Sequence, residues 1–197
     1  MAIIRANNNT LSSVTALPFA TGGLVKLKTT DVTSAQATVT FDNTVITDTY
    51  DKYILSYQGL SPVSNGAYYR TRYSDDNGSS FKTGTFNYGY HYTRLGGVGT
   101  SGTGNTKSDY ATSDYACSSA IDDHSSGMFS IDGLRDATLD LHIRNEFIQK
   151  TTGGGQYYYV SQEGWHYSKS FTLNYIEFSF NTGNIADGTF TLYGLAK

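Results

Sequence analysis

Carboxylates and histidines are the side chains from which this 197-residue chain would have to build a metal site or acid–base catalysis. Asp122, Asp123 and His124 are adjacent, but neighbouring side chains of an extended segment point apart. The other three histidines are scattered, so none follows at a spacing that would complete a metal site. We therefore interpret residues 122–124 as a solvated turn and expect no metal and no other cofactor.

Nucleophilic catalysis leaves no signature in the sequence. Serine and aspartate are frequent enough to offer many chance Ser–His–Asp pairings, and nothing singles one out. Gly97–Gly102 satisfies the G-x-G-x-x-G pattern, but a dinucleotide site needs a helix after it, and GTGNTKSDYATS is no helix. A carboxylate pair assembled only by the fold stays open on the sequence alone. We expect that the protein is not an enzyme.

One short motif, SDDNGSSF (Ser74–Phe81), matches the pattern S-x-D-x-G-x-S/T-aromatic. It resembles the Asp-box of sialidases and other glycan-handling β-proteins, in which the box recurs and lies away from the active site. Asp76 is expected to accept backbone N–H bonds, Gly78 to supply a positive φ, and Phe81 to pin the turn to the core. The single copy predicts a structural hairpin tip that binds no ligand.

Aromatic residues carry the main binding signal. The chain has 17 tyrosines, and in YYY (157–159) the middle ring must face away from its neighbours. Tyrosine and tryptophan favour interfaces because they combine apolar area with a polar tip, and they also stack on sugar rings. Packing between subunits of a homo-oligomer is favoured over glycan contact. The candidate contact residues are Tyr90, Tyr92, Tyr158, Trp165 and Tyr167.

The composition predicts an all-β protein. Charged residues make up only 16% of the chain, and there are 21 glycines but 2 prolines. The net charge of −3 argues against a nucleic-acid partner, which would require a cationic face. No apolar run approaches the ~18 residues of a membrane span. The start of the chain has no signal-peptide pattern, and the single Cys117 cannot form an intramolecular disulfide, so synthesis in a cytoplasm is expected.

Alternating apolar and polar residues predict about ten strands and no confident helix. The fold expected is a single β-sandwich of jelly-roll type over residues 23–197. Leu139, Leu141, Ile176 and Phe178 are predicted core residues, and 94–109 and 145–155 are predicted long loops. The strands are expected at 24–28, 36–41, 53–58, 67–73, 85–92, 127–131, 137–143, 156–161, 171–181 and 190–195.

Residues 1–22 are predicted to form an extended N-terminal arm for assembly. The segment is rich in Asn, Ser and Thr, with too few apolar residues to form a core of its own. Such a pattern is typical of a segment that orders against a neighbouring surface. Its expected anchors are Leu11, Val14, Leu17 and Phe19.

Three segments carry a resemblance to a known group of proteins. They are IEFSFNTGNIADGTFTLYGLAK (Ile176–Lys197), which we expect to be a β-hairpin, the opening ANNNTLSSVTALP (Ala6–Pro18), and TVTFDNTVITDTYDKYILSYQGLSP (Thr38–Pro62). They resemble virion structural proteins of tailed bacteriophages, notably phages of marine bacteria and cyanobacteria. The middle of the chain resembles these proteins only in composition, with Tyr-, Gly- and Ser/Thr-rich strands separated by long loops.

This resemblance implies a place in the virion, as a tail-fibre, appendage or capsid-decoration component. The expected partners are the chain itself, as a homo-oligomer and most simply a trimer, and other virion proteins. A receptor-binding module for host-surface glycan is the alternative, and a glycan depolymerase is a third class that nothing in the sequence requires.

Overall fold

The structure is a computed structural model, and it describes most of the chain beyond the N-terminal segment. The described residues are 23–83, 86–94, 99–103, 111–112, 116–120, 123–150, 157–166 and 171–196. The anchors Leu11, Val14, Leu17 and Phe19 lie outside these ranges, as does Tyr167.

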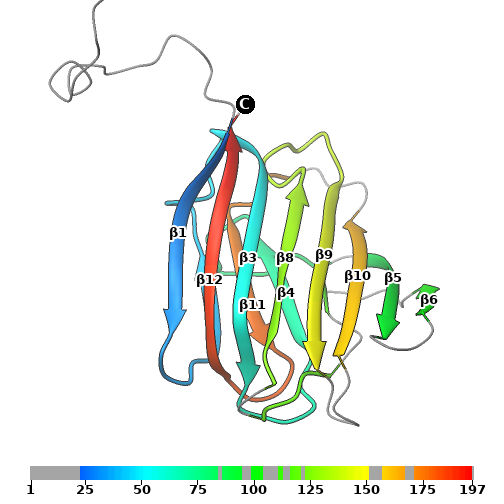
Figure 1. Cartoon of the computed structure of the whole chain (residues 1–197). Coiled ribbons are helices and arrows are strands. Elements are labelled where there is room, and N and C mark those ends of the chain that lie inside the picture. The colour runs from blue at the N-terminus through cyan, green and yellow to red at the C-terminus, as the bar shows by residue number, and fades with distance from the viewer. Residues whose placement is uncertain are drawn as a thin grey trace, which may run out of the picture.

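Twelve strands form two antiparallel sheets across the described residues (Figure 1). The eight-stranded sheet has the order β1-β12-β3-β8-β9-β10-β5-β6, and the four-stranded sheet has the order β2-β11-β4-β7. The strands are β1 (Leu24–Val32), β2 (Thr38–Phe41), β3 (Tyr50–Pro62), β4 (Tyr69–Ser74), β5 (Phe86–Arg94), β6 (Gly99–Thr103), β7 (Ala111–Thr112), β8 (Ser125–Asp132), β9 (Leu141–Lys150), β10 (Tyr157–His166), β11 (Tyr175–Phe180) and β12 (Ile185–Ala196).

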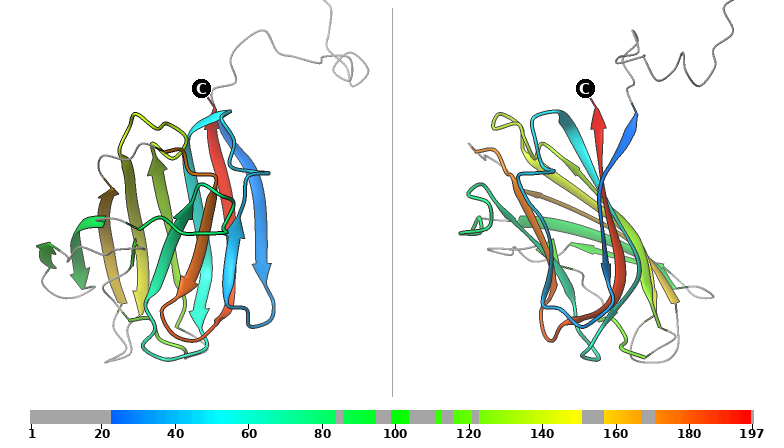
Figure 2. Two further views of the ribbon diagram at one scale, coloured as in Figure 1. Left: turned by 180° about the vertical axis from the view of Figure 1, so that it is seen from behind. Right: turned by 90° about the vertical axis from the view of Figure 1, so that its left-hand side faces the viewer.

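The all-β prediction is confirmed for the described residues, none of which forms a helix. The edge-on view shows two layers, with β2, β11 and β4 facing part of the wider sheet (Figure 2). No helix able to cross a membrane is found within the described ranges.

The core fills the space between the sheets, and its residues follow the predicted alternation. In β4, Tyr69, Thr71 and Tyr73 are buried while Arg70 and Arg72 stay partly exposed. The eight-stranded sheet contributes inward residues from four strands: Tyr53, Leu55 and Tyr57 of β3, Phe129 and Ile131 of β8, Leu141, Ile143 and Phe147 of β9, and Phe190 and Leu192 of β12. Alternate residues on these strands therefore form one apolar layer.

The expected closing hairpin is wrong. β11 pairs with β2 and β4, whereas β12 pairs with β1 and β3, so the two strands lie in different sheets. Their apolar faces meet across the core instead, with the rings of Phe178 and Phe190 4.9 Å apart between centroids. The alternating pattern shows that each strand buries one face, and it cannot show whether the two strands are neighbours or opposite each other.

The strand predicted over residues 137–143 begins too early. β9 starts at Leu141, and the preceding residues form a turn in which Asp136 Oδ1 accepts bonds from the backbone N–H (2.8 Å) and hydroxyl (2.6 Å) of Thr138. Leu141, Ile176 and Phe178 are buried as predicted, but Leu139 is 55% exposed. The alternation of apolar and polar residues extends by chance from β9 back into residues 137–140, which form a turn that Asp136 stabilises locally.

The predicted loops also contain strands. β9 continues through residues 145–150, and β6 lies within the expected loop 94–109. Asn145 and Gln149 point inward and are buried, so polar residues occupy core positions that a sequence pattern assigns to a loop. Glycine-rich β6 pairs only with β5, at the edge of the sheet.

Replacing Leu141 by alanine should lower the free energy of unfolding by about 2–5 kcal/mol, because it opens a cavity in the core. Leu139→Ala should change it by less than about 0.5 kcal/mol, since that side chain is exposed. Urea denaturation of both variants measures the difference. Equal losses would contradict the inward assignment of β9.

Candidate functional site

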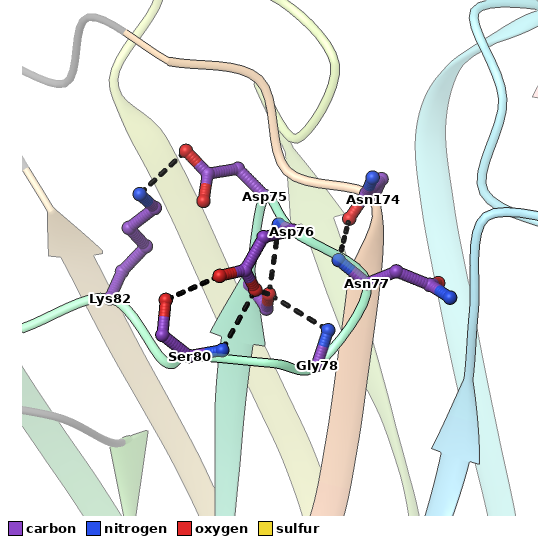
Figure 3. Close-up of polar contacts among 8 residues, drawn as sticks. Asp75, Asp76, Asn77, Gly78, Ser80, Lys82 and Asn174 are labelled. Carbon is purple, nitrogen blue, oxygen red and sulfur yellow. Dashed lines mark hydrogen bonds and ion pairs between the residues drawn. The ribbon is translucent and has the colours of Figure 1, made fainter.

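The SDDNGSSF segment follows β4 and is organised around two side chains, Ser74 and Asp76 (Figure 3). The Ser74 hydroxyl donates to Asp76 Oδ1 (2.6 Å) and accepts from the backbone N–H groups of Asp76 (3.1 Å) and Gly78 (3.0 Å). Ser80 donates its N–H to Asp76 Oδ1 (2.8 Å) and its hydroxyl to Asp76 Oδ2 (2.6 Å). Both carboxylate oxygens are therefore engaged by donors of the loop itself.

Backbone conformation explains the glycine in this segment. Gly78 has φ +87°, and a Cβ atom there would lie 2.8 Å from the Tyr175 ring. Asn77 also has a positive φ, 59°. Its backbone N–H donates to Asn174 Oδ1 (3.1 Å), and its side-chain Oδ1 accepts from the backbone N–H of Asn43 (3.1 Å). Contacts from two distant segments, residues 174–175 and Asn43, thus fix the loop.

Phe81 joins the segment to the outer side of the four-stranded sheet. Its ring lies 6.2 Å from the Tyr175 ring, and the Arg72 guanidinium lies over it at 3.9 Å. Arg72 also donates through two nitrogens to Glu177 Oε1, at 3.0 and 2.5 Å. The chain turns back locally, since Lys82 N–H donates to Tyr73 O (2.9 Å), but the next strand, β5, belongs to the other sheet. The segment is therefore a loop between the two sheets, and its prediction as a hairpin tip is wrong.

The hydrogen bonds donated to Asp76, first of all by Ser74 and Ser80, hold the pKa of its carboxyl well below the usual range. Asp76 is therefore ionised at neutral pH and has no proton to give as a general acid. Its arrangement can hold a loop in place, because Ser74 and Ser80 donate hydrogen bonds to both carboxylate oxygens.

Four of the five candidate aromatic contacts are brought together by the pairing of β5 with β10. The register places Tyr90 opposite Gln162 and Tyr92 opposite Val160. It also places Tyr158 opposite Arg94 and Trp165 opposite Asn87. All four positions lie toward one edge of the eight-stranded sheet, on the side away from β1.

An exposed apolar strip crosses the outer face of the eight-stranded sheet. We define it as Met128 of β8, Ile148 of β9 and Tyr159 of β10, which are 45%, 47% and 38% exposed. Ile148 pairs directly with Tyr159 and lies diagonally next to Met128, whose partner is Glu146. The three side chains form a continuous outer apolar strip on a sheet face that no other described element covers.

Sequence reasoning missed Met128 and Ile148. The signal was present, because both residues stand at outward positions of strands whose other outward residues are polar or charged, such as Ser130 and Arg144. Because residues 145–155 were predicted to form a loop, the outward position of Ile148 on β9 could not be recognised from the sequence.

Within the described residues, no group of three or more His, Cys, Asp or Glu side chains is placed to hold a metal ion. Asp123 forms an ion pair with Lys150, while His124 is exposed. No protein-family model matches the chain, and no match is found among curated proteins or solved structures.

Gly78→Val should lower the free energy of unfolding by roughly 2–4 kcal/mol, because valine resists the positive φ and meets the Tyr175 ring. Gly66→Val is the matched control, since Gly66 has φ +82° with nothing within 4 Å of its Cβ position. Urea denaturation should show a smaller loss for the control. Equal losses would mean that Tyr175 does not restrict the loop.

The contribution of the Asp76 charge to stability should depend on pH. Because the folded-state pKa is lowered, this stability is present above the unfolded-state pKa of about 3.9 and is lost as the pH falls toward the folded-state value. The difference in unfolding free energy between the wild type and Asp76→Asn should therefore be largest near neutral pH and shrink below about pH 4. A difference that stays constant between pH 7 and pH 3 would contradict this account.

Proposed function

We propose that this chain is a non-enzymatic structural protein of a tailed-bacteriophage virion, made in the host cytoplasm and acting through homo-oligomeric assembly. The single observation that carries the assembly part is the outer apolar strip, because contiguous apolar side chains on an open sheet face are typical of a protein–protein contact. The proposal takes the oligomer to be a trimer and the virion component to be a fibre, appendage or capsid decoration.

The placement of the phage-like segments supports the virion part of the proposal. Residues 38–62 supply β2 and β3, and residues 176–197 supply β11 and β12. β11 pairs with β2 in one sheet, and β12 pairs with β3 in the other. The resembling segments thus fold into one unit on both sides of the core, as expected for a scaffold whose remaining strands vary.

Strand connectivity favours the jelly-roll type within the sandwich class. When β5, β6, β9 and β10 are set aside, the eight remaining strands alternate between the two sheets along the chain, except that β4 and β7 both lie in the four-stranded sheet. They then form two four-stranded layers, with the orders β1-β12-β3-β8 and β2-β11-β4-β7. A doubled sheet of this kind is how jelly rolls limit exposed edges. The four additional strands extend the wider sheet at one side only.

A host-glycan receptor-binding module is the second candidate, and the β5–β10 pairing favours it. Tyrosine and tryptophan positions gather on two neighbouring strands, far from the unit formed by the phage-like segments. Binding to a glycan array that is lost in Tyr158→Ala or Trp165→Ala, with the fold retained, would support this function. Turnover of the bound polysaccharide would instead indicate a depolymerase.

The assembly proposal is tested by light scattering on the full chain and on Ile148→Lys. The wild type should have the mass of an oligomer, and the variant should lose mass with an unchanged circular-dichroism spectrum, because a lysine charge would be buried in the contact. Val63→Lys is the control, since Val63 is 53% exposed and lies outside the strip. A monomeric wild type, or a variant of unchanged mass, would overturn the proposal.

Deletion of residues 1–22 should leave the two sheets folded, because β1 to β12 all lie beyond residue 23. The truncated chain should fail to join the virion or the native oligomer. Immunogold labelling of virions made with either chain measures incorporation. Normal incorporation of the truncated chain would contradict a role of the arm in assembly.

A further inference from the structure

The loop between β8 and β9, residues 133–140, is fixed at several points. Leu134 is fully buried, and its carbonyl oxygen accepts from the N–H of Leu173 at 2.8 Å. Arg135 pairs with Asp48 (2.5 Å) and donates to Leu173 O (3.1 Å). Together with the turn stabilised by Asp136, these contacts give the loop a defined shape.

This well-fixed loop nevertheless exposes a large apolar side chain. Leu139 is 55% exposed, the largest value among the big hydrophobic residues that the structure describes. Two hollows of about 470 and 390 Å³ lie beside it. Leu139, Gly133 and Asp132 line both of them. We name these the Leu139 hollows.

The Leu139 hollows carry a negative charge. Across the two, the lining contains four aspartates (51, 132, 136 and 140) and Arg135. With the ion-pair partners included, Lys52 on Asp132 (3.0 Å) and Asp48 on Arg135 (2.5 Å), five aspartates face two cations, a formal charge of −3 with His142 neutral. An apolar segment that brings a positive charge would therefore match both the exposed Leu139 and the surrounding carboxylates.

The chain before β1 reaches the sandwich at the same end as the hollows. One row of paired residues crosses the eight-stranded sheet there: Leu24, Leu195, Lys52, Asp132 and His142. Leu24 opens β1, and Asp132 lines both hollows three strands away. At about 4.8 Å per strand the separation is roughly 14 Å.

Residues 1–22 have the complementary chemistry. Arg5 is the only charged side chain in the segment, which contains no Asp or Glu, and apolar residues recur from Ile3 to Phe19. Fully extended, 22 residues span up to roughly 70 Å. That is several times the distance to the hollows of the same chain, so the segment is long enough to extend beyond its own domain.

We propose that residues 1–22 of one copy dock in the Leu139 hollows of a neighbouring copy, with an apolar anchor against Leu139 and Arg5 near the aspartates. The inference rests on the proposed homo-oligomer and adds the surface that receives the arm. It explains why a loop with so many internal contacts presents a leucine to solvent.

Paramagnetic relaxation in mixed samples of the full chain tests the docking. One population carries Ser12→Cys with a nitroxide label, and the other is isotope-labelled wild type. Cys117 does not compete for the label, because it is buried and burial raises the pKa of its thiol to about 12. Amide signals of residues 133–140 in the isotope-labelled copy should broaden, whereas those of residues 59–63, at the far end of β3, should not.

Leu139→Ser in the isotope-labelled copy should abolish the broadening and raise the concentration for half-assembly about tenfold or more, as expected for losing one buried leucine contact. Val63→Ser is the matched control and should change neither readout. Arg5→Glu in the spin-labelled copy should weaken the broadening.

The outcomes separate this inference from the proposed function. An oligomer whose 133–140 signals stay sharp, or whose assembly is unaffected by Leu139→Ser, would overturn the docking site and leave the assembly proposal intact. A second sample carries the nitroxide and the isotope label on the same chain. Broadening seen only in that sample would mean that residues 1–22 bind the hollows of their own chain, and it would also overturn the inference. A wild type that stays monomeric would remove the proposed function itself.

Discussion

The packing of Phe178 between the two sheets is the contact on which the rest of the fold depends. From β11 its ring contacts Tyr57 and Phe190 of the eight-stranded sheet, with centroid distances of 5.9 and 4.9 Å. It also stacks with Tyr69 of the neighbouring strand β4, at 5.6 Å. Large aromatic rings bury enough area to hold two sheets together without a disulfide, and the only cysteine of the chain is a buried thiol.

The same interior contains a polar network that specifies how the sheets meet. Asn145 donates to the Tyr69 hydroxyl (2.8 Å) and accepts from the Tyr57 hydroxyl (3.3 Å), joining β9, β4 and β3. Burial raises the pKa of both tyrosines, so they stay neutral at any ordinary pH. Because a buried hydroxyl without a partner is unfavourable, the network disfavours other alignments of the two sheets.

The Tyr57–Asn145–Tyr69 network and the SDDNGSSF segment thus hold the fold, and the features left for a partner are on the outside. They are the outer apolar strip on β8, β9 and β10 and the Leu139 hollows beside the loop between β8 and β9. The strip and the hollows are two different surfaces, so one chain could contact two neighbours at once.

The sequence by itself determined the all-β class, the buried face of β11, and the glycine and aspartate that shape the SDDNGSSF turn. These are local properties, because alternation and turn chemistry act within a few residues. Tertiary structure alone decided that β11 and β12 lie in opposite sheets and that Met128, Ile148 and Tyr159 join in one strip. Such features depend on strand partners far apart in the chain, and a pattern of buried and exposed positions carries no information about which partner each strand finds.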